Sequence, residues 1–231
     1  MAQCSDRGTV VHDFLQEWLT LSPAEQMDMD GLIPTMIQFR QMTMTEIDWE
    51  KQAVEELAQY CKQAALAYAK YPTPVAQEFV CGWDYTHDRN ISDDTFTVSY
   101  SDDDKTLPFP VEELGMGIVG RGDALLQRKG VITFNDLKTS QGYWSAKTKT
   151  QVHRVYLTTK TGKPNARHKK LTEQLAAYAK GLPSHLPTPT LFSATFAFPT
   201  RHDTFEFTEE DIKEAEIRFL NKMNLFRESF S

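Results

Sequence analysis

The chain has 231 residues, of which 40% are apolar and 25% are charged, and its formal net charge is −7. These values are typical of a globular protein, and we expect a single domain over residues 1–231. No run of 18 apolar residues occurs, which argues against a membrane span, and three widely spaced cysteines argue against a disulfide framework. Because the N-terminus also has no signal-peptide pattern, we expect an intracellular, cytoplasmic protein (in the host cytoplasm if phage-encoded) that is not secreted.

The first part of the chain is predicted to be mainly helical. Residues 7–21 have apolar side chains at helical spacing, and Ser22 followed by Pro23 is typical of a new helix start. The segment 45–70 has the apolar stripe of a long amphipathic helix that ends before two prolines. We therefore expect helices over most of residues 1–75.

Strands are expected to form a sheet core in the remainder of the chain, residues 76–231. The predicted strands and hairpin segments are 77–86, 95–100, 117–126, 131–137, 190–200 and 204–208, with an acidic loop at 101–108. Residues 150–159 fit either a strand or a basic loop. Helices are predicted over 171–183, ended by Gly181, and over 208–228, capped by Thr208. This order predicts an α/β or α+β domain with a central mixed sheet flanked by helices.

Charge is unevenly distributed along the chain. Residues 1–136 have 10 basic and 23 acidic side chains, a net charge of −13, whereas residues 137–231 have 15 basic and 9 acidic ones, a net charge of +6. The segment 137–172 contains nine lysines and arginines and no acid. Such a run of one sign is expected either in a solvated loop or in a phosphate-binding face. The side chains predicted to bind nucleic acid are Lys147, Lys149, Arg154, Lys163, Arg167, Lys169 and Lys170.

The segment GRGDALLQRKGVITFNDLKTS, residues 120–140, predicts a hairpin with an aspartate at each open end. If Lys129 and Gly130 form a two-residue turn, residues whose numbers sum to 259 are opposite one another, and Asp123 faces Asp136. Opposed Cβ atoms are about 4.5–5.5 Å apart, so both carboxylates could bind one divalent ion with Lys138 on the same face. Taken alone, Asp123 is more typical of a turn residue and Asp136 of a strand-end cap, and a bulge would shift the register.

Four short motifs, GTVVH, GRGD, DLKTS and QLAAY, occur in this order between residues 8 and 178. This arrangement resembles the RecB-like branch of the PD-(D/E)xK nuclease superfamily, which includes the CRISPR-adaptation nucleases and mitochondrial and phage exonucleases. The resemblance implies a restriction-endonuclease-like core. It also implies hydrolysis of DNA with Mg²⁺ or Mn²⁺.

The resemblance implies a role for each matched residue. His12, Asp123, Asp136 and the backbone carbonyl of Leu137 would be metal ligands, and Lys138 would orient or deprotonate the attacking water. Gln174 and Tyr178 lie one helical turn apart and would point at the site or at substrate phosphate. Glu78 is the acid best placed for a further ligand on the preceding strand, although an ordinary strand-face glutamate is an equal alternative.

The departures from the family pattern narrow these expectations. No cysteine follows Cys81, so we expect no iron–sulfur cluster, and no phosphate-binding loop of the ATPase type occurs, so we expect no nucleotide cofactor. The expected function is a nuclease, acting as an exonuclease on single-stranded or end-containing DNA in recombination, repair or degradation, with other recombination proteins as partners. Two alternatives stay open, a catalytically silent DNA-binding or regulatory module and a restriction-type endonuclease. Tyr143, Trp144 and Tyr156 could stack on bases or pack in the core.

Overall fold

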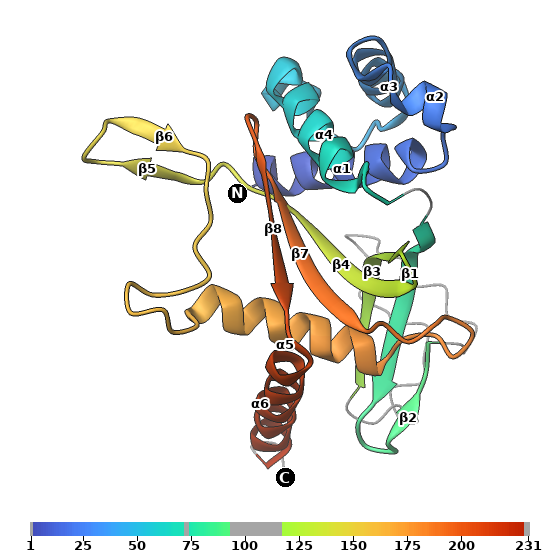
Figure 1. The fold of residues 1–231 in the computed structure, drawn as a ribbon, viewed down its shortest axis with the longest axis vertical. Coiled ribbons are helices and arrows are strands. Elements are labelled where there is room, and N and C mark those ends of the chain that lie inside the picture. The colour runs from blue at the N-terminus through green and yellow to red at the C-terminus, as the bar shows by residue number, and fades with distance from the viewer. Residues whose placement is uncertain (1, 72–73, 93–116, 229–231) are drawn as a thin grey trace.

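A six-stranded mixed sheet with helices on both faces forms the body of the protein in the computed structural model, which describes residues 2–71, 74–92 and 117–228 (Figure 1). Its strands are β1 (Pro74–Asp84), β2 (Arg89–Asn90), β3 (Gly117–Arg128), β4 (Val131–Thr139), β7 (Leu191–Ala197) and β8 (His202–Phe207). The order is β2–β1–β3–β4–β7–β8; β4 and β7 are parallel, and the other neighbours are antiparallel. The predicted α/β class with a central mixed sheet is confirmed, while the predicted 95–100 strand and 101–108 loop lie outside the described residues.

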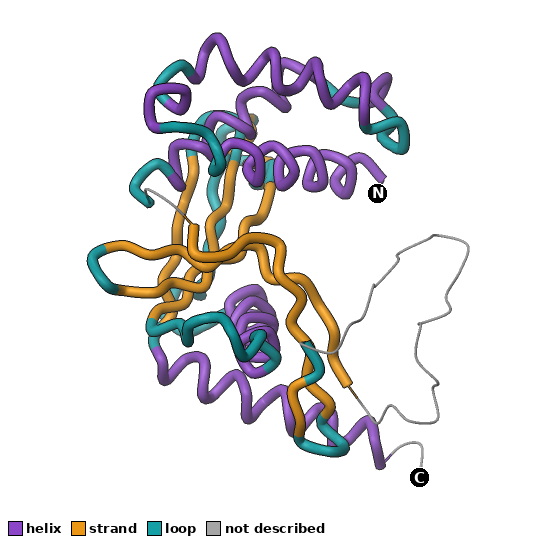
Figure 2. The backbone as a smooth tube through the Cα atoms, turned by 90° about the vertical axis from the view of Figure 1, so that its right-hand side faces the viewer, coloured by secondary structure: helices purple, strands orange, loops and turns teal. Residues whose placement is uncertain are grey.

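The helices separate into two layers, one on each side of the sheet (Figure 2). The helices are α1 (Ala2–Trp18), α2 (Pro23–Gln26), α3 (Met29–Thr43), α4 (Val54–Tyr68), α5 (Ala166–Lys180) and α6 (Glu209–Glu228). Along β3, Ala124 and Leu126 pack with the N-terminal helices, whereas Leu125 packs with α5 and α6. This alternation is the period-two pattern of a strand buried on both faces. Burial of each leucine contributes about 1.5–3 kcal/mol.

The N-terminal helices differ in two places from the sequence prediction. Helix α3 was not predicted, because Gly31 and Pro34 weaken its local signal; burial of residues such as Ile37 and the Asp28 cap stabilise it instead. The predicted 45–70 helix begins only at Val54, after a 3₁₀ turn at Trp49–Lys51. The predicted helix start at Ser22 and Pro23 is confirmed, and Glu25 completes a capping box with Ser22. None of the described helices has the length and apolar character that crossing a bilayer requires.

The C-terminal half follows the prediction more closely. The β7–β8 hairpin and the Thr208 cap of α6 are confirmed. Helix α5 begins at Ala166 rather than at residue 171, because the Asn165 side chain caps it by accepting the backbone N–H of His168 at 3.0 Å. Only Thr150–Val152 of the predicted 150–159 strand is extended; it is β6, and it pairs with β5 (Tyr143–Ser145) in a hairpin that projects from the body (Figure 1).

The β3–β4 hairpin has the predicted turn and register. Lys129 and Gly130 have φ values of 50° and 82°, which is the pattern of a type I′ turn, and the paired residues sum to 259 from Arg128–Val131 to Ala124–Asn135. The ladder ends at Ala124–Asn135, one pair before Asp123 and Asp136. From there β4 continues along β7, so the sheet opens between β3 and β4.

Candidate metal site between β3 and β4

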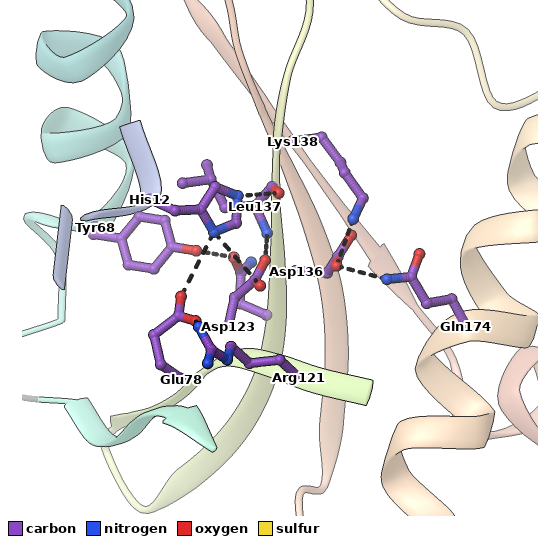
Figure 3. A network of polar contacts seen from close by, with 10 residues as sticks. His12, Tyr68, Glu78, Arg121, Asp123, Asp136, Leu137, Lys138 and Gln174 are labelled. Carbon is purple, nitrogen blue, oxygen red and sulfur yellow. Dashed lines mark hydrogen bonds and ion pairs between the residues drawn. The ribbon is translucent and has the colours of Figure 1, made fainter. Parts of the chain in front are cut away.

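Side chains from α1 and β3 fill the opening between the two strands (Figure 3). The Asp123 carboxylate accepts the backbone N–H of Leu137 at 2.6 Å, and Nε2 of His12 donates to the Leu137 carbonyl at 3.0 Å. Both polar backbone groups of Leu137 are therefore satisfied by side chains on the side where β3 has diverged. The hydrogen bond also sets the tautomer of the imidazole, because a carbonyl only accepts, and it leaves Nδ1 of His12 available as a ligand.

His12, Glu78 and Asp123 form a cluster of possible metal ligands. Nδ1 of His12 lies 3.6 Å from Oε1 of Glu78 and 3.6 Å from Oδ1 of Asp123, and one donor atom from each residue lies within 4.8 Å of the others. These residues line a cavity of about 10 Å³, which is about the space of one water molecule. One imidazole nitrogen and two carboxylate oxygens are suitable donors for Mn²⁺ or Mg²⁺.

Glu78 reaches this cluster through an unusual backbone conformation. In the β1–β3 ladder Gln77 pairs with Ala124 and Phe79 with Gly122, which places Glu78 opposite Asp123. Its φ of 47° is left-handed, inside a strand, and costs about 1–3 kcal/mol in a residue other than glycine. Oε2 of Glu78 also lies 3.5 Å from the Arg121 guanidinium. A strained residue that presents a carboxylate to a histidine is the kind of feature that functional sites retain.

Substitutions at Glu78 provide a test of this strain. Both Glu78→Ala and Glu78→Gly remove the carboxylate, but only glycine adopts a positive φ without steric cost. We expect Glu78→Gly to be more stable than Glu78→Ala by about 1 kcal/mol in urea unfolding, the reverse of the usual order within a strand. A Glu78→Ala protein of equal or greater stability would contradict the left-handed conformation.

The negative charge of the cluster changes the pKa values of its members. Burial, followed by the charge of Asp136, raises the pKa of Asp123 to about 7. Burial alone would lower the pKa of His12, but the hydrogen bond to Glu78 and the charge of Asp123 outweigh it, so that pKa is raised. Both shifts indicate an excess of buried negative charge, which a divalent cation would relieve.

Asp136, the second predicted carboxylate ligand, lies beside the cluster and not within it. Its Oδ1 accepts from Nζ of Lys138 at 2.8 Å and from Nε2 of Gln174 at 3.3 Å (Figure 3). Its Oδ2 is buried and has no hydrogen-bond partner among the described residues, which is rare for a carboxylate oxygen and leaves it available to a cation or a water molecule. The structure therefore brings together His12, Glu78 and Asp123 on one side, and Asp136 with Lys138 and Gln174 on the other.

Tyr178 packs flat over the sheet behind these groups. Its ring stacks on Phe134 with centroids 6.4 Å apart, and a Cβ atom built on Gly120 would lie 2.3 Å from its Cε1. Gly122 similarly leaves room for the Phe79 ring, which a Cβ would approach to 2.5 Å. Both glycines of the GRGD motif are thus explained by rings that pack directly on the backbone. Burial raises the pKa of Tyr178, so its hydroxyl is neutral at physiological pH.

Gly120→Ala is expected to displace the Tyr178 ring and, through α5, Gln174. The clash should cost about 1–3 kcal/mol of stability. Gly8→Ala is the matched control: it lies within helix α1, its Cβ would be an ordinary 3.7 Å from Thr139 Oγ1, and alanine should stabilise the helix. Unfolding curves of the two variants check this, and equal stability changes would contradict the close packing of Tyr178.

A buried polar chain beneath the site was not predicted. The Tyr68 hydroxyl donates to Oδ1 of Asn135, whose amide donates to Ser193 at 2.6 Å and to Thr195 at 3.0 Å. The sequence signal was the single asparagine in the apolar strand VITFNDL, because a buried amide requires partners. The pKa of Tyr68 is raised well above its ordinary value, first by burial and then by Asp123 and Asp136.

The predicted basic residues are all exposed but do not form one surface. Arg167 and Lys170 on α5 line an open groove of about 350 Å³ together with Lys138 and Gln174. Lys147 and Lys149 instead lie at the tip of the β5–β6 hairpin. The other basic residues predicted to bind nucleic acid are Arg154, Lys163 and Lys169. The groove thus adjoins the Asp136 side of the site and offers cations to an anionic substrate.

A comparison with protein-family models and with curated proteins finds no match to this chain. His12, Gln174 and the charged residues of the metal site and of the adjoining groove come from five elements, α1, β1, β3, β4 and α5. Such convergence of chemically active side chains is typical of a catalytic or binding site.

Proposed function

We propose that this protein is a metal-dependent nuclease that hydrolyses the phosphodiester bonds of DNA. The observation that carries the proposal is the meeting of His12, Glu78 and Asp123 around a cavity for one ion, with Lys138 on the adjacent Asp136. The mixed sheet with helices on both faces is compatible with the restriction-endonuclease-like core that the sequence resemblance implies. That resemblance is also the support for DNA as substrate and for exonuclease action on single strands or ends.

The residues present fit a bound Mg²⁺ or Mn²⁺. Nδ1 of His12 and the carboxylates of Glu78 and Asp123 would hold it, and the unpartnered Oδ2 of Asp136 is a further oxygen donor nearby. Such an ion, when bound, polarises a phosphate and lowers the pKa of water. The Leu137 carbonyl, which the resemblance implies as a ligand, here orients His12 through a hydrogen bond.

Lys138 supplies positive charge to the reacting phosphate in this proposal. Burial alone would lower the pKa of Lys138, but the charges of Asp136 and Asp123 outweigh it, so that pKa is raised and the ammonium persists at neutral pH. Without a change in this environment, Lys138 stabilises negative charge on phosphate oxygens and does not accept a proton. Gln174 holds Asp136 in place, and Arg167 and Lys170 would neutralise neighbouring phosphates of the strand in the groove.

Cleavage of circular and linear DNA tests the proposal against its alternatives. Purified protein would be incubated with covalently closed circular DNA, linear duplex and an end-labelled single strand, each with Mn²⁺, Mg²⁺ or EDTA. Metal-dependent loss of the linear and single-stranded substrates alone supports an exonuclease, and cleavage of the circle supports a restriction-type endonuclease. If the folded protein binds Mn²⁺ but cleaves none of these substrates, the result supports the alternative of a catalytically silent DNA-binding or regulatory module.

A further inference from the structure

A second pocket lies at the outer edge of the sheet, along β8. It is open, has a volume of about 530 Å³, and is formed by the end of α4, the loop after β6 and the first residues of β8. None of its lining residues belongs to the metal site or to the groove beside it. Four basic side chains from three distant parts of the sequence meet there: Lys70, Arg154, Arg201 and His202.

The positive charge of this β8 pocket is only partly neutralised. Asp203 is the acidic residue among its lining residues, and it contacts the Arg201 guanidinium. Lys70 lies 5.2 Å from the centre of the Tyr71 ring and Arg154 lies 5.8 Å from that of Tyr156, and within the described ranges neither forms an ion pair with a carboxylate. Lys70 and Arg154 thus face an open pocket without an ion pair to a carboxylate among the described residues, which leaves both cations available to an anionic ligand.

The pocket also has an aromatic surface. The side chain of Tyr156 is 52% exposed, and its ring lies 6.2 Å from that of Tyr143 on the β5–β6 hairpin. His202 is oriented by a 3.3 Å hydrogen bond from Nδ1 to Oε1 of Gln63. An exposed ring beside unpaired cations is the combination with which proteins bind a base and its phosphate in unpaired nucleic acid.

We propose that the β8 pocket binds a single DNA strand away from the metal site, with one phosphate between Lys70 and Arg154 and its base stacked on Tyr156. DNA as the source of this phosphate rests on the proposed nuclease function. A single strand is favoured over a duplex because a base must leave its stack to reach the tyrosine face. The pocket would retain the substrate while the groove near Lys138 presents it for hydrolysis.

Binding without cleavage tests this assignment. A fluorescein-labelled 15-nucleotide oligothymidylate would be titrated with the protein in EDTA and followed by anisotropy at several salt concentrations. We expect Lys70→Ala/Arg154→Ala to weaken binding at least about tenfold and to reduce the salt slope by about 0.7, since each neutralised phosphate of a single strand contributes about that amount. Tyr156→Leu should also weaken binding, whereas Tyr156→Phe should retain it.

The controls separate the pocket from overall charge and from the metal site. Lys213→Ala/Lys222→Ala on α6 removes the same charge and should leave affinity unchanged. The proposal would be overturned if the Lys70→Ala/Arg154→Ala protein bound the oligonucleotide with unchanged affinity. It would also be overturned if dTMP or inorganic phosphate displaced the oligonucleotide equally from wild type and from that variant. Hydrolysis of bis(4-nitrophenyl) phosphate with Mn²⁺ should be equally fast in wild type and in the pocket variants. If wild type does not hydrolyse this compound while oligonucleotide binding behaves as expected, the nuclease proposal fails and the proposal for the β8 pocket is retained.

Discussion

Replacement of Asp123 by asparagine is expected to lower the rate of metal-dependent DNA cleavage at least about a thousandfold, because a carboxylate of the ion site is lost. Asparagine has nearly the same shape, and its amide oxygen can still accept the Leu137 N–H that Asp123 accepts at 2.6 Å. The loss should therefore come from charge and not from misfolding. Single-turnover cleavage of an end-labelled strand measures it, with Asp30→Asn on the exposed face of α3 as the control.

The same substitution is expected to stabilise the protein at alkaline pH in the absence of metal. Burial and the neighbouring Asp136 raise the pKa of Asp123 from 3.8 to about 7, so this carboxyl favours the folded state when protonated and disfavours it when ionised. Its contribution to stability is present at low pH and is lost as pH rises through about 7. Asparagine does not titrate. The difference in unfolding free energy between Asp123→Asn and wild type should therefore grow by a few kcal/mol, on the order of 1.4 per pKa unit, between pH 4 and pH 8.

Addition of Mn²⁺ should reduce the stability difference between Asp123→Asn and wild type. A ligand that binds only the folded state stabilises it, by about 2.7 kcal/mol at a concentration one hundred times its Kd. We expect the Tm of wild type to rise with Mn²⁺ at pH 8 and that of Asp123→Asn to stay nearly constant. An equal rise in both proteins would show that the ion binds elsewhere and would contradict the site at His12, Glu78 and Asp123.

Lys138→Gln is expected to lower kcat about 100- to 1,000-fold, the usual effect of losing one group that stabilises transition-state charge. Unlike Asp123→Asn, it should retain stabilisation by Mn²⁺, because Lys138 contacts Asp136 and is not part of the ion cluster. Glutamine can still donate one hydrogen bond to Asp136, so the loss isolates the ammonium charge.

Lys170→Gln is the matched control for Lys138→Gln, since both lysines line the same groove. Lys170→Gln should weaken DNA binding and reduce the salt dependence of that binding, and it should leave kcat at saturating substrate nearly unchanged. Lys138→Arg should recover part of the lost activity because it restores the charge. Equal kcat values for Lys138→Gln and Lys170→Gln would indicate that Lys138 binds the strand without acting on the reacting phosphate.

Much of the site's framework could be predicted from local sequence. The turn at Lys129–Gly130 determines the register of β3 and β4, because two-residue loops with positive φ allow only one pairing of the adjoining strands. Period-two alternation then assigns Leu125 and Leu126 to opposite faces. The order of the four motifs made His12 a candidate metal ligand, and the structure places that histidine beside Asp123.

The grouping of those residues was decided by tertiary structure. The β3–β4 ladder ends one pair before Asp123 and Asp136, so the two carboxylates have different neighbours: Asp123 meets Glu78, and Asp136 meets Lys138. For Glu78 a ligand and an ordinary strand-face glutamate were equal alternatives, because the local sequence does not report the positive φ of 47° that this residue adopts within β1.

By itself, the sequence determined features that depend on near neighbours in the chain: the turn, the register, the helix caps and the alternation of faces. Only the tertiary structure decided that position 120 needs a residue without a side chain, because the Tyr178 ring packs against it. The tertiary structure likewise decided that Lys70, Arg154 and His202 line one pocket at β8. The physical reason is the distance along the sequence over which each kind of interaction acts. Turn and strand preferences arise from backbone sterics within a few residues, whereas contacts between distant segments follow from the strand order and from the close packing of complete side chains.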